Sequence, residues 1–224
     1  MKLAAQTYTV RKFTQTQEDI SRTLERLKGI GYRAIQISGF GKYDPEWLKG
    51  ELDRLDIEVC ATHTPPADII EDTVRVIKEH RLLKIPYVGI GMYKMYTLKE
   101  CDEFCKQIAP AAEKIAQNGL KLLYHNHAHE FIKEGGEWII ERLLHNFEPE
   151  LLGLLVDFYW VQRAGYPPEK FLQEHADRIP VVHFKDMRAV ADYDVTPQYM
   201  EIFEGNMDYE TIYRVCVENG VEWA

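Results

Sequence analysis

Leu151-Leu152-Gly153-Leu154-Leu155-Val156-Asp157 is the stretch that decides the fold. The run before the aspartate contains only leucine, valine and glycine. A strand that is apolar throughout is buried on both faces, as in a parallel sheet covered by helices, whereas a half-exposed hairpin strand alternates apolar and polar residues. The stretch therefore predicts a parallel strand inside the protein, with Asp157 at its carboxyl end.

Short apolar runs of this kind alternate along the chain with segments of helical period. Thr16 and Asp19 resemble a capping box at the start of one helix, and Thr97 and Glu100 repeat that signal before another. A strand followed by a helix, repeated many times, is the βαβ pattern of a parallel sheet. The expected strands are residues 3–9, 32–38, 57–63, 85–91, 120–125, 152–157 and 179–184.

Seven such units fit either an open doubly wound sheet or a closed barrel. No GxGxxG or GxxxxGK[ST] pattern follows the first expected strand, which weakens the nucleotide-binding versions of the open sheet. We therefore predict an α/β fold, a (β/α)8 TIM barrel formed by one domain over residues 1–224. Val221-Glu222-Trp223-Ala224 has the pattern of an eighth strand, and such barrels have typically about 250 residues. The barrel is thus expected to be truncated at the start of strand eight.

The composition narrows the class of protein. The chain has 224 residues, 46% of them hydrophobic and 28% charged, and a net charge of -9, which gives no electrostatic footprint for nucleic acid. No apolar stretch reaches the roughly 18 residues of a membrane helix, and no signal peptide is visible. The four cysteines form no CxxC motif, a usage typical of reduced thiols. We predict a cytoplasmic protein with no nucleic-acid or membrane partner, and an open barrel edge would allow a homo-oligomer.

Residues that can bind a metal gather where the expected strands end. Strand five runs into Tyr124-His125-Asn126-His127-Ala128-His129-Glu130-Phe131, strand six ends at Asp157, strand seven at His183 and strand three at His63. The carboxyl ends of the strands carry the chemistry in TIM barrels. Imidazole and carboxylate together suit Mn, Co or Zn. The pattern therefore predicts one divalent metal ion at this end of the barrel.

Each of these residues also has a plain structural interpretation. A lone aspartate after a strand is commonly a helix cap, and a lone buried histidine is commonly a satisfied core residue. The coincidence of such residues on three adjacent strands favours the metal site. Lys185 and Arg188 can bind an oxyanion or hydroxyl groups, or can be solvated, and Trp160 can stack on a sugar ring or pack in the barrel.

At these positions the sequence resembles the sugar phosphate isomerase/epimerase family of xylose isomerase-like TIM barrels. It resembles in particular the branch with the signature YHNHxxEF, here Tyr124 to Phe131. The resemblance covers essentially the whole chain and includes Val156-Asp157-Phe158-Tyr159-Trp160, His183-Phe184-Lys185-Asp186 and Gly220-Val221-Glu222-Trp223.

The resemblance implies one divalent metal ion, Mn, Co or Zn, held by Glu, Asp, His and a second Glu. Asp157 and His183 match the aspartate and histidine ligands. Glu130 is the favoured ligand from strand five, with His125 as its rival, and the second glutamate would follow the end of the sequence. Trp160 stands where the epimerases carry a histidine, so we expect different handling of the substrate.

The activity that the resemblance implies is metal-dependent isomerisation or epimerisation of a keto-sugar or related polyol through an enediolate, with a small carbohydrate as the partner. Loss of a β-leaving group from the same intermediate makes a dehydratase or lyase, acting on an inosose or a 3-keto-glycoside, the nearest alternative. A barrel that binds a carbohydrate or a partner protein without catalysis is the alternative of another class. The predicted catalytic residues are Glu130, His125 and Lys185, and the predicted substrate contacts are His63, His127, Trp160 and Arg188.

Overall fold

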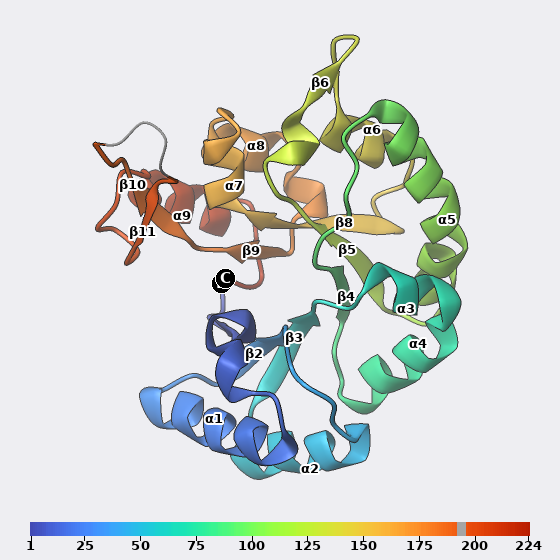
Figure 1. The fold of residues 1–224 in the computed structure, drawn as a ribbon, viewed down its shortest axis with the longest axis vertical. Coiled ribbons are helices and arrows are strands. Elements are labelled where there is room, and N and C mark those ends of the chain that lie inside the picture. The colour runs from blue at the N-terminus through green and yellow to red at the C-terminus, as the bar shows by residue number, and fades with distance from the viewer. Residues whose placement is uncertain (192–195) are drawn as a thin grey trace.

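The apolar runs form one curved parallel sheet of seven strands with helices along its outer side (Figure 1). The computed structural model describes residues 1–191 and 196–224. The strands follow one another in the order β1-β2-β3-β4-β5-β8-β9, and every neighbouring pair is parallel. Their bounds are β1 Ala5–Gln6, β2 Ala34–Ile37, β3 Glu58–Thr62, β4 Tyr87–Ile90, β5 Lys121–His125, β8 Leu152–Asp157 and β9 Val181–His183. This is the predicted TIM-barrel fold.

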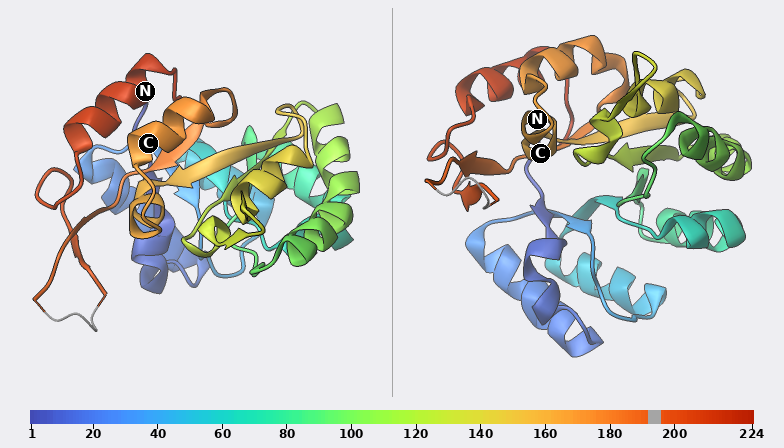
Figure 2. Two further views of the ribbon diagram at one scale, coloured as in Figure 1. Left: turned by 90° about the horizontal axis from the view of Figure 1, so that it is seen from above. Right: turned by 45° about the horizontal axis from the view of Figure 1, so that its top comes forward.

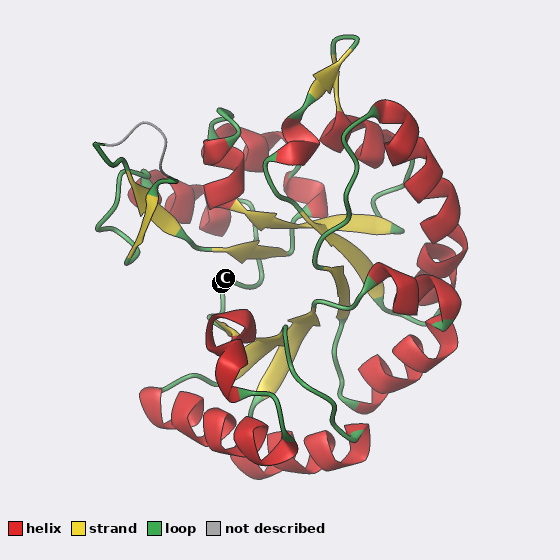
Figure 3. Cartoon of the chain, in the orientation of Figure 1, coloured by secondary structure: helices red, strands yellow, loops and turns green. Residues whose placement is uncertain are grey.

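Capped helices connect the strands and form the outer layer (Figure 3). Thr16 accepts a hydrogen bond from the Asp19 backbone, and Thr97 with Glu100 forms a complete capping box, so both predicted helix starts are confirmed. The α-helices are α1 Gln17–Ile30, α2 Pro45–Leu55, α3 Pro66–Glu71, α4 Thr73–Leu82, α5 Leu98–Gln117, α6 Ile139–His145, α7 Phe158–Arg163, α8 Pro168–Glu174 and α9 Tyr209–Glu218. Three 3-10 helices are η1 Thr7–Phe13, η2 His129–Phe131 and η3 Ala176–Arg178.

Two small antiparallel pairs lie outside the main sheet. β6 (Lys133–Glu134) pairs with β7 (Glu137–Trp138), and β10 (Asp186–Arg188) pairs with β11 (Gln198–Met200). The second pair forms the hairpin that follows β9, and it extends beyond the ring of helices in Figure 1.

Residues 222–224 occupy the predicted position of strand eight. Trp223 makes parallel bridges to Val181 on one side and to Lys2 on the other. The backbone N–H of Lys2 donates to Glu222 at 2.8 Å, and that of Val182 donates to Trp223 at 2.9 Å. The two ends of the chain therefore lie side by side between β9 and β1, as Figure 2 shows.

The first strand is shorter than predicted. Only Ala5 and Gln6 are strand, and the residues from Thr7 onward form η1, so the prediction of a strand over 3–9 was wrong at its carboxyl end. The Thr7 hydroxyl donates to the backbone oxygens of Gln36 and Ser38, at 3.0 and 2.9 Å. These bonds take the place of the ladder and turn the chain over the end of the barrel.

The core lies on both faces of the sheet, as the apolar strands require. Every residue of β8 is buried. Small residues such as Ala34 and Ala61 pack with Leu123, Leu155 and Val181 on the inner face. The outer face packs against the helices in a larger apolar cluster. Among the described helices, none is long and apolar enough to cross a membrane.

Candidate metal and substrate site

The carboxyl ends of the strands bring three histidines and an aspartate together. His125 ends β5, Asp157 ends β8 and His183 ends β9, and Asp157 is paired in register with His183. His63 follows β3. One ring nitrogen from each of the three histidines lies within 4.8 Å of the others. The sequence prediction that these strand ends share one site is thereby supported by their geometry.

The two carboxylate oxygens of Asp157 make different contacts. Its Oδ1 accepts a hydrogen bond from the Tyr159 backbone N–H at 3.0 Å and so caps α7. Its Oδ2 faces Nε2 of His125 at 3.7 Å and Nδ1 of His183 at 3.8 Å. One oxygen of this side chain therefore caps a helix, and the other faces the two histidines.

In His125 and His183, the ring nitrogen farther from Asp157 makes a hydrogen bond. That bond determines whether the nitrogen nearer to Asp157 carries a proton or a lone pair. His125 Nδ1 lies 2.9 Å from the backbone oxygen of Gly91. A carbonyl oxygen only accepts, so Nδ1 carries the proton and Nε2 presents a lone pair to Asp157. His183 Nε2 lies 2.6 Å from Oε1 of Gln36, which leaves Nδ1 as the nitrogen toward Asp157.

These distances are too long for hydrogen bonds and suit a cation between the groups. Two ligand atoms that are each about 2.1 Å from one ion are separated by roughly 3.4 Å in a tetrahedron and at most about 4.2 Å. The separations of Asp157 Oδ2 from His125 and His183 fall inside that limit. A metal-binding histidine usually donates its other N–H to a carbonyl or carboxylate, as His125 does to Gly91.

Unpartnered nitrogens mark the same place. Four buried side-chain atoms lack a hydrogen-bond partner in the described part of the chain: Nε2 of Gln36, Nε2 of His63, Nε2 of His125 and Nδ1 of His127. Leaving a buried polar atom unpaired costs about 1–3 kcal/mol. Native proteins keep few such atoms, and their concentration at one site is typical of a place that binds a polar ligand. The residues present therefore fit a divalent cation with a polar substrate.

The charges at the site follow from burial. Burial opposes the charged form of Asp157, but the nearby imidazoles of His125 and His183 outweigh it and hold the pKa of the carboxyl below its usual value. Burial lowers the pKa of His183 and, much more strongly, that of His63. The pKa of His127 is lowered to about 3, first by burial and then by the nearby His125. At neutral pH the Asp157 carboxylate thus lies beside the unprotonated imidazoles of His63, His127 and His183.

Asn126 joins the ends of β5 and β8. It is fully buried, and its Oδ1 accepts a hydrogen bond from the Asp157 backbone N–H at 2.9 Å. Its Nδ2 donates to the Asp157 backbone oxygen at 3.4 Å. The Asn of the YHNH sequence therefore fixes the spacing between His125 and Asp157.

Glu130 lies in a separate hydrogen-bond network. Its Oε1 accepts from the Tyr124 hydroxyl at 2.7 Å and lies 3.2 Å from His129 Nε2, and its Oε2 accepts from the His127 backbone at 2.8 Å. Among the described residues, no hydrogen bond or ion pair joins Glu130 to Asp157. Burial raises the pKa of the Glu130 carboxyl. These contacts hold the turn after β5, and His125 is the strand-five residue that lies against Asp157.

Lys185 lies among three aromatic rings. Its Nζ is 4.4 Å from the ring centre of Tyr159, 4.8 Å from that of Trp160 and 4.4 Å from that of Tyr199. Trp160 in turn packs against the His127 ring, with 5.1 Å between centroids. The predicted residues Lys185, Trp160 and His127 thus form a continuous wall beside the histidine cluster.

Arg188 is the predicted residue that lies apart. It is on β10, its side chain is exposed, and its guanidinium donates two hydrogen bonds to Gln198 Oε1, at 3.0 and 2.7 Å. Its described contacts are therefore within the β10–β11 hairpin and not with the histidine cluster.

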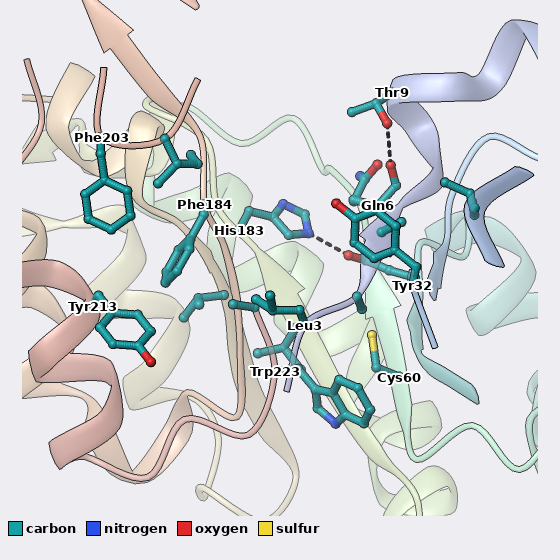
Figure 4. Close-up of a pocket in the computed structure, with 18 residues that line it drawn as sticks. Leu3, Gln6, Thr9, Tyr32, Cys60, His183, Phe184, Phe203, Tyr213 and Trp223 are labelled. Atoms are coloured by element: carbon teal, nitrogen blue, oxygen red, sulfur yellow. Dashed lines mark hydrogen bonds between the residues drawn. The ribbon is translucent and has the colours of Figure 1, made fainter. Parts of the chain in front are cut away.

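Two cavities reach the cluster from different sides. One, of about 620 Å³, is lined by Gln36 and His183 and otherwise mostly by apolar residues such as Phe184 and Trp223 (Figure 4). The other, of about 820 Å³, lies between the segments that follow β2 and β3, and His63 is among its lining residues. Both volumes are in the range of small-molecule sites.

Three residues of the site have no role in the sequence prediction. Gln36 is a polar residue inside an otherwise apolar strand, and that signal was present in Ala34-Ile35-Gln36-Ile37. Asn126 lies inside the quoted signature, but its bonds to Asp157 join two strands that are far apart in sequence. Tyr199 gave no signal, since it reaches Lys185 only through the fold of the hairpin.

Comparison with known proteins identifies the family of this chain. Residues 24–222 match the family model described as xylose isomerase-like TIM barrel. An inosose dehydratase of Lactiplantibacillus plantarum is 29% identical in an alignment of 237 positions that covers 90% of this chain and 78% of that protein. An inosose dehydratase of Geobacillus kaustophilus is 40% identical over 200 residues, which cover 77% of this chain and 63% of that protein.

Solved structures show the same fold. A sugar phosphate isomerase/epimerase from Parabacteroides distasonis superposes with a TM-score of 0.78 at 21% identity, covering 99% of this chain and 84% of that chain. The probable 3-DHS dehydratase AsbF from Bacillus anthracis superposes with a TM-score of 0.74 at 18% identity, covering 97% and 89%. The predicted family is confirmed by the match to the family model over residues 24–222: the chain belongs to the xylose isomerase-like TIM barrel family.

Proposed function

We propose that this protein is a metal-dependent dehydratase that removes water from a keto-polyol of the inosose type. The observation that supports this proposal is the cluster of unpartnered buried nitrogens near Asp157, which a cation together with a polar ligand would satisfy. Two relatives named inosose dehydratase support the choice of reaction. This choice favours the lyase alternative over the isomerase or epimerase reaction that the sequence ranked first.

We place the cation at Asp157 Oδ2, His125 Nε2 and His183 Nδ1, with His63 Nε2 beside them. Three imidazoles and a carboxylate suit Zn, Co or Mn. When bound, the cation supplies Lewis-acid polarisation of the substrate carbonyl and so acidifies the neighbouring C–H. Glu130 holds the turn between β5 and η2 in this arrangement, because its oxygens are engaged by Tyr124 and His127.

The other residues of the site bind the polyol and transfer protons. His127 is unprotonated because burial lowers its pKa, and its Nδ1, which has no partner among the described residues, can accept a carbon-bound proton or a hydroxyl hydrogen. The Lys185 ammonium lies over the rings of Tyr159 and Trp160, from where it can protonate a departing hydroxyl. Trp160 offers an apolar face to the ring of the substrate.

The test joins metal content with a reaction assay on the purified full chain. Elemental analysis should find about one equivalent of Zn, Co or Mn, lost in Asp157→Ala and His183→Ala. With metal restored, scyllo-inosose should lose one water, detected by mass spectrometry. Well-folded protein that takes up no metal from an excess of Zn²⁺ would contradict the proposal and favour a non-catalytic carbohydrate-binding barrel.

The same assay separates the dehydratase from the isomerase or epimerase. In deuterated water, both reactions exchange the proton next to the substrate carbonyl. Only dehydration lowers the mass of the product by one water. Exchange of this proton for deuterium without loss of water would contradict the dehydratase proposal. It would favour isomerisation or epimerisation of a keto-sugar.

A further inference from the structure

Gln36 is a buried polar side chain that contacts one of the proposed metal ligands. It lies on β2 between Ile35 and Ile37, and only 2% of its surface is exposed. Its Oε1 is 2.6 Å from His183 Nε2, and its Nε2 is one of the unpartnered buried atoms. Burying an amide with half of its hydrogen bonds unmade is costly, so its retention at this place requires an explanation.

The bond to Gln36 decides the orientation of the His183 ring. In the described part of the chain it is the ring's one hydrogen bond, because Asp157 Oδ2 lies 3.8 Å from Nδ1. An amide oxygen at this position holds the proton on Nε2 and leaves a lone pair on Nδ1, toward Asp157. The amide turned by half a rotation would present its N–H₂ group, move the proton to Nδ1 and abolish that lone pair.

The second half of the Gln36 amide is oriented for another acceptor. Gln36 and His183 line the same cavity of about 620 Å³, and the dashed line at His183 in Figure 4 is their hydrogen bond. A buried N–H₂ group without a partner requires an oxygen. The hydroxyl or carbonyl oxygen of a polyol beside His183 would satisfy it.

We propose that Gln36 is a positioning residue with two functions: its amide oxygen holds His183 in the tautomer that presents Nδ1 as a ligand, and its amide nitrogen donates a hydrogen bond to a substrate oxygen. The first function concerns the apo protein and stands by itself. The second rests on the proposed function, because it needs the polyol in the site.

Three variants separate the two functions. Gln36→Leu removes both the acceptor and the donor at similar volume. Gln36→Glu keeps an acceptor for His183 and removes the donor. Gln107→Leu changes an exposed glutamine on α5 and serves as the control.

The readout for positioning is the tautomer of His183 in the apo protein, measured from the ¹⁵N shifts of its ring and assigned with His183→Gln. Wild type, Gln36→Glu and Gln107→Leu should carry the proton on Nε2, and Gln36→Leu should show a mixture. Calorimetry with Zn²⁺ should show about 10-fold weaker binding in Gln36→Leu, in the range found when the partner of a metal-binding histidine is lost. Gln36→Glu should bind Zn²⁺ at least as tightly as wild type.

The substrate contact is tested by comparing the effect of a variant on Zn²⁺ affinity with its effect on KM. Gln36→Glu should bind Zn²⁺ normally and yet raise KM for inosose, because only the donor is gone. A wild-type His183 with its proton on Nδ1, or Gln36→Leu with an unchanged tautomer and unchanged Zn²⁺ affinity, would overturn the positioning role. An unchanged KM in Gln36→Glu would overturn the substrate contact.

Failure of this inference is distinguishable from failure of the proposed function. If no variant or wild type acts on a keto-polyol, but Gln36→Leu still shifts the His183 tautomer, the positioning role holds and the dehydratase proposal fails. If wild type dehydrates inosose and Gln36→Leu equals it in tautomer and Zn²⁺ affinity, the dehydratase proposal holds and the positioning role fails.

Discussion

His125 Nε2 and Asp157 Oδ2 face each other at 3.7 Å across the ends of β5 and β8 without a proton to join them. The ring proton of His125 is engaged on the other side, at the Gly91 oxygen. A lone pair and a carboxylate held this close repel each other unless a cation lies between them. The fold keeps this arrangement in place through Asn126, which binds both backbone groups of Asp157. Such locally unfavourable arrangements are expected at functional sites.

The first prediction separates His125 from Glu130 as the ligand from strand five. His125→Ala should abolish stoichiometric metal binding, because it removes a lone pair that faces Asp157. Glu130→Gln should keep the metal, since the amide oxygen can still accept from Tyr124 and the His127 backbone. Elemental analysis of the two variants beside wild type checks this. Loss of metal in Glu130→Gln with retention in His125→Ala would restore Glu130 as the ligand.

The architecture was predictable because burial on both faces of a parallel strand leaves a strong composition signal. The run before Asp157 and its counterparts gave the strand order, and the caps at Thr16 and Thr97 gave the helix starts. The prediction of the first strand was wrong because the Thr7 hydroxyl donates hydrogen bonds to backbone oxygens at the end of β2. No local pattern in the sequence reveals such a contact between distant segments.

The sequence predicts which residues lie at the strand ends of the site. It does not predict which of these side chains contact one another. His63, His125, Asp157 and His183 were selected by their position at strand ends, and the structure brings them together. The choice between His125 and Glu130 depends on how the turn after β5 folds, and the 3-10 helix at 129–131 directs Glu130 toward Tyr124. Such side-chain directions depend on tertiary contacts that spacing in the sequence does not encode.

The second prediction concerns Asn126, whose side chain joins the ends of β5 and β8. Asn126→Ala should lower the free energy of unfolding by about 2 kcal/mol, because it leaves the buried backbone N–H of Asp157 unpaired. Asn146→Ala, at an exposed amide, should lower it by no more than about 1 kcal/mol. Urea unfolding of both variants measures the difference. Equal losses in the two variants would show that the bonds to Asp157 contribute nothing beyond an ordinary surface contact.

The third prediction is a pH dependence that arises from His80. Burial lowers the pKa of His80 to about 4 from an ordinary value of 6.5, despite its bond to the Val76 backbone. The unfolded chain therefore binds more protons than the folded protein between pH 4 and 6.5, so stability from His80 is complete above pH 6.5 and is lost as the pH falls toward 4. The full change is about 3 kcal/mol.

The measurement is the free energy of unfolding from pH 4 to 7 in wild type and in His80→Gln, which can still bond to Thr62. The variant should lose less stability over this interval than wild type. His145→Gln, at an exposed histidine, is the matched control and should follow the wild-type curve. Parallel curves for wild type and His80→Gln would contradict the prediction.

The fourth prediction concerns Tyr199, which reaches Lys185 from the β10–β11 hairpin. Tyr199→Ala removes one of the three rings around the Lys185 ammonium, a contact of about 0.5–1 kcal/mol at an exposed site. The kcat/KM for inosose should fall by about 2- to 5-fold, the factor that corresponds to this energy. Tyr199→Phe keeps the ring and should remain near wild type. Lys185→Met removes the proposed proton donor and should lower kcat by about 100-fold or more.

The contrast among these three variants decides what the hairpin contributes. If Tyr199 acts only as an aromatic face for Lys185, the hydroxyl is dispensable, and combining Tyr199→Ala with Lys185→Met should lower the rate no further than Lys185→Met alone. An additive loss in the double variant would show that Tyr199 contacts the substrate directly. A loss in Tyr199→Phe as large as in Tyr199→Ala would assign the effect to the hydroxyl and remove the cation–π explanation.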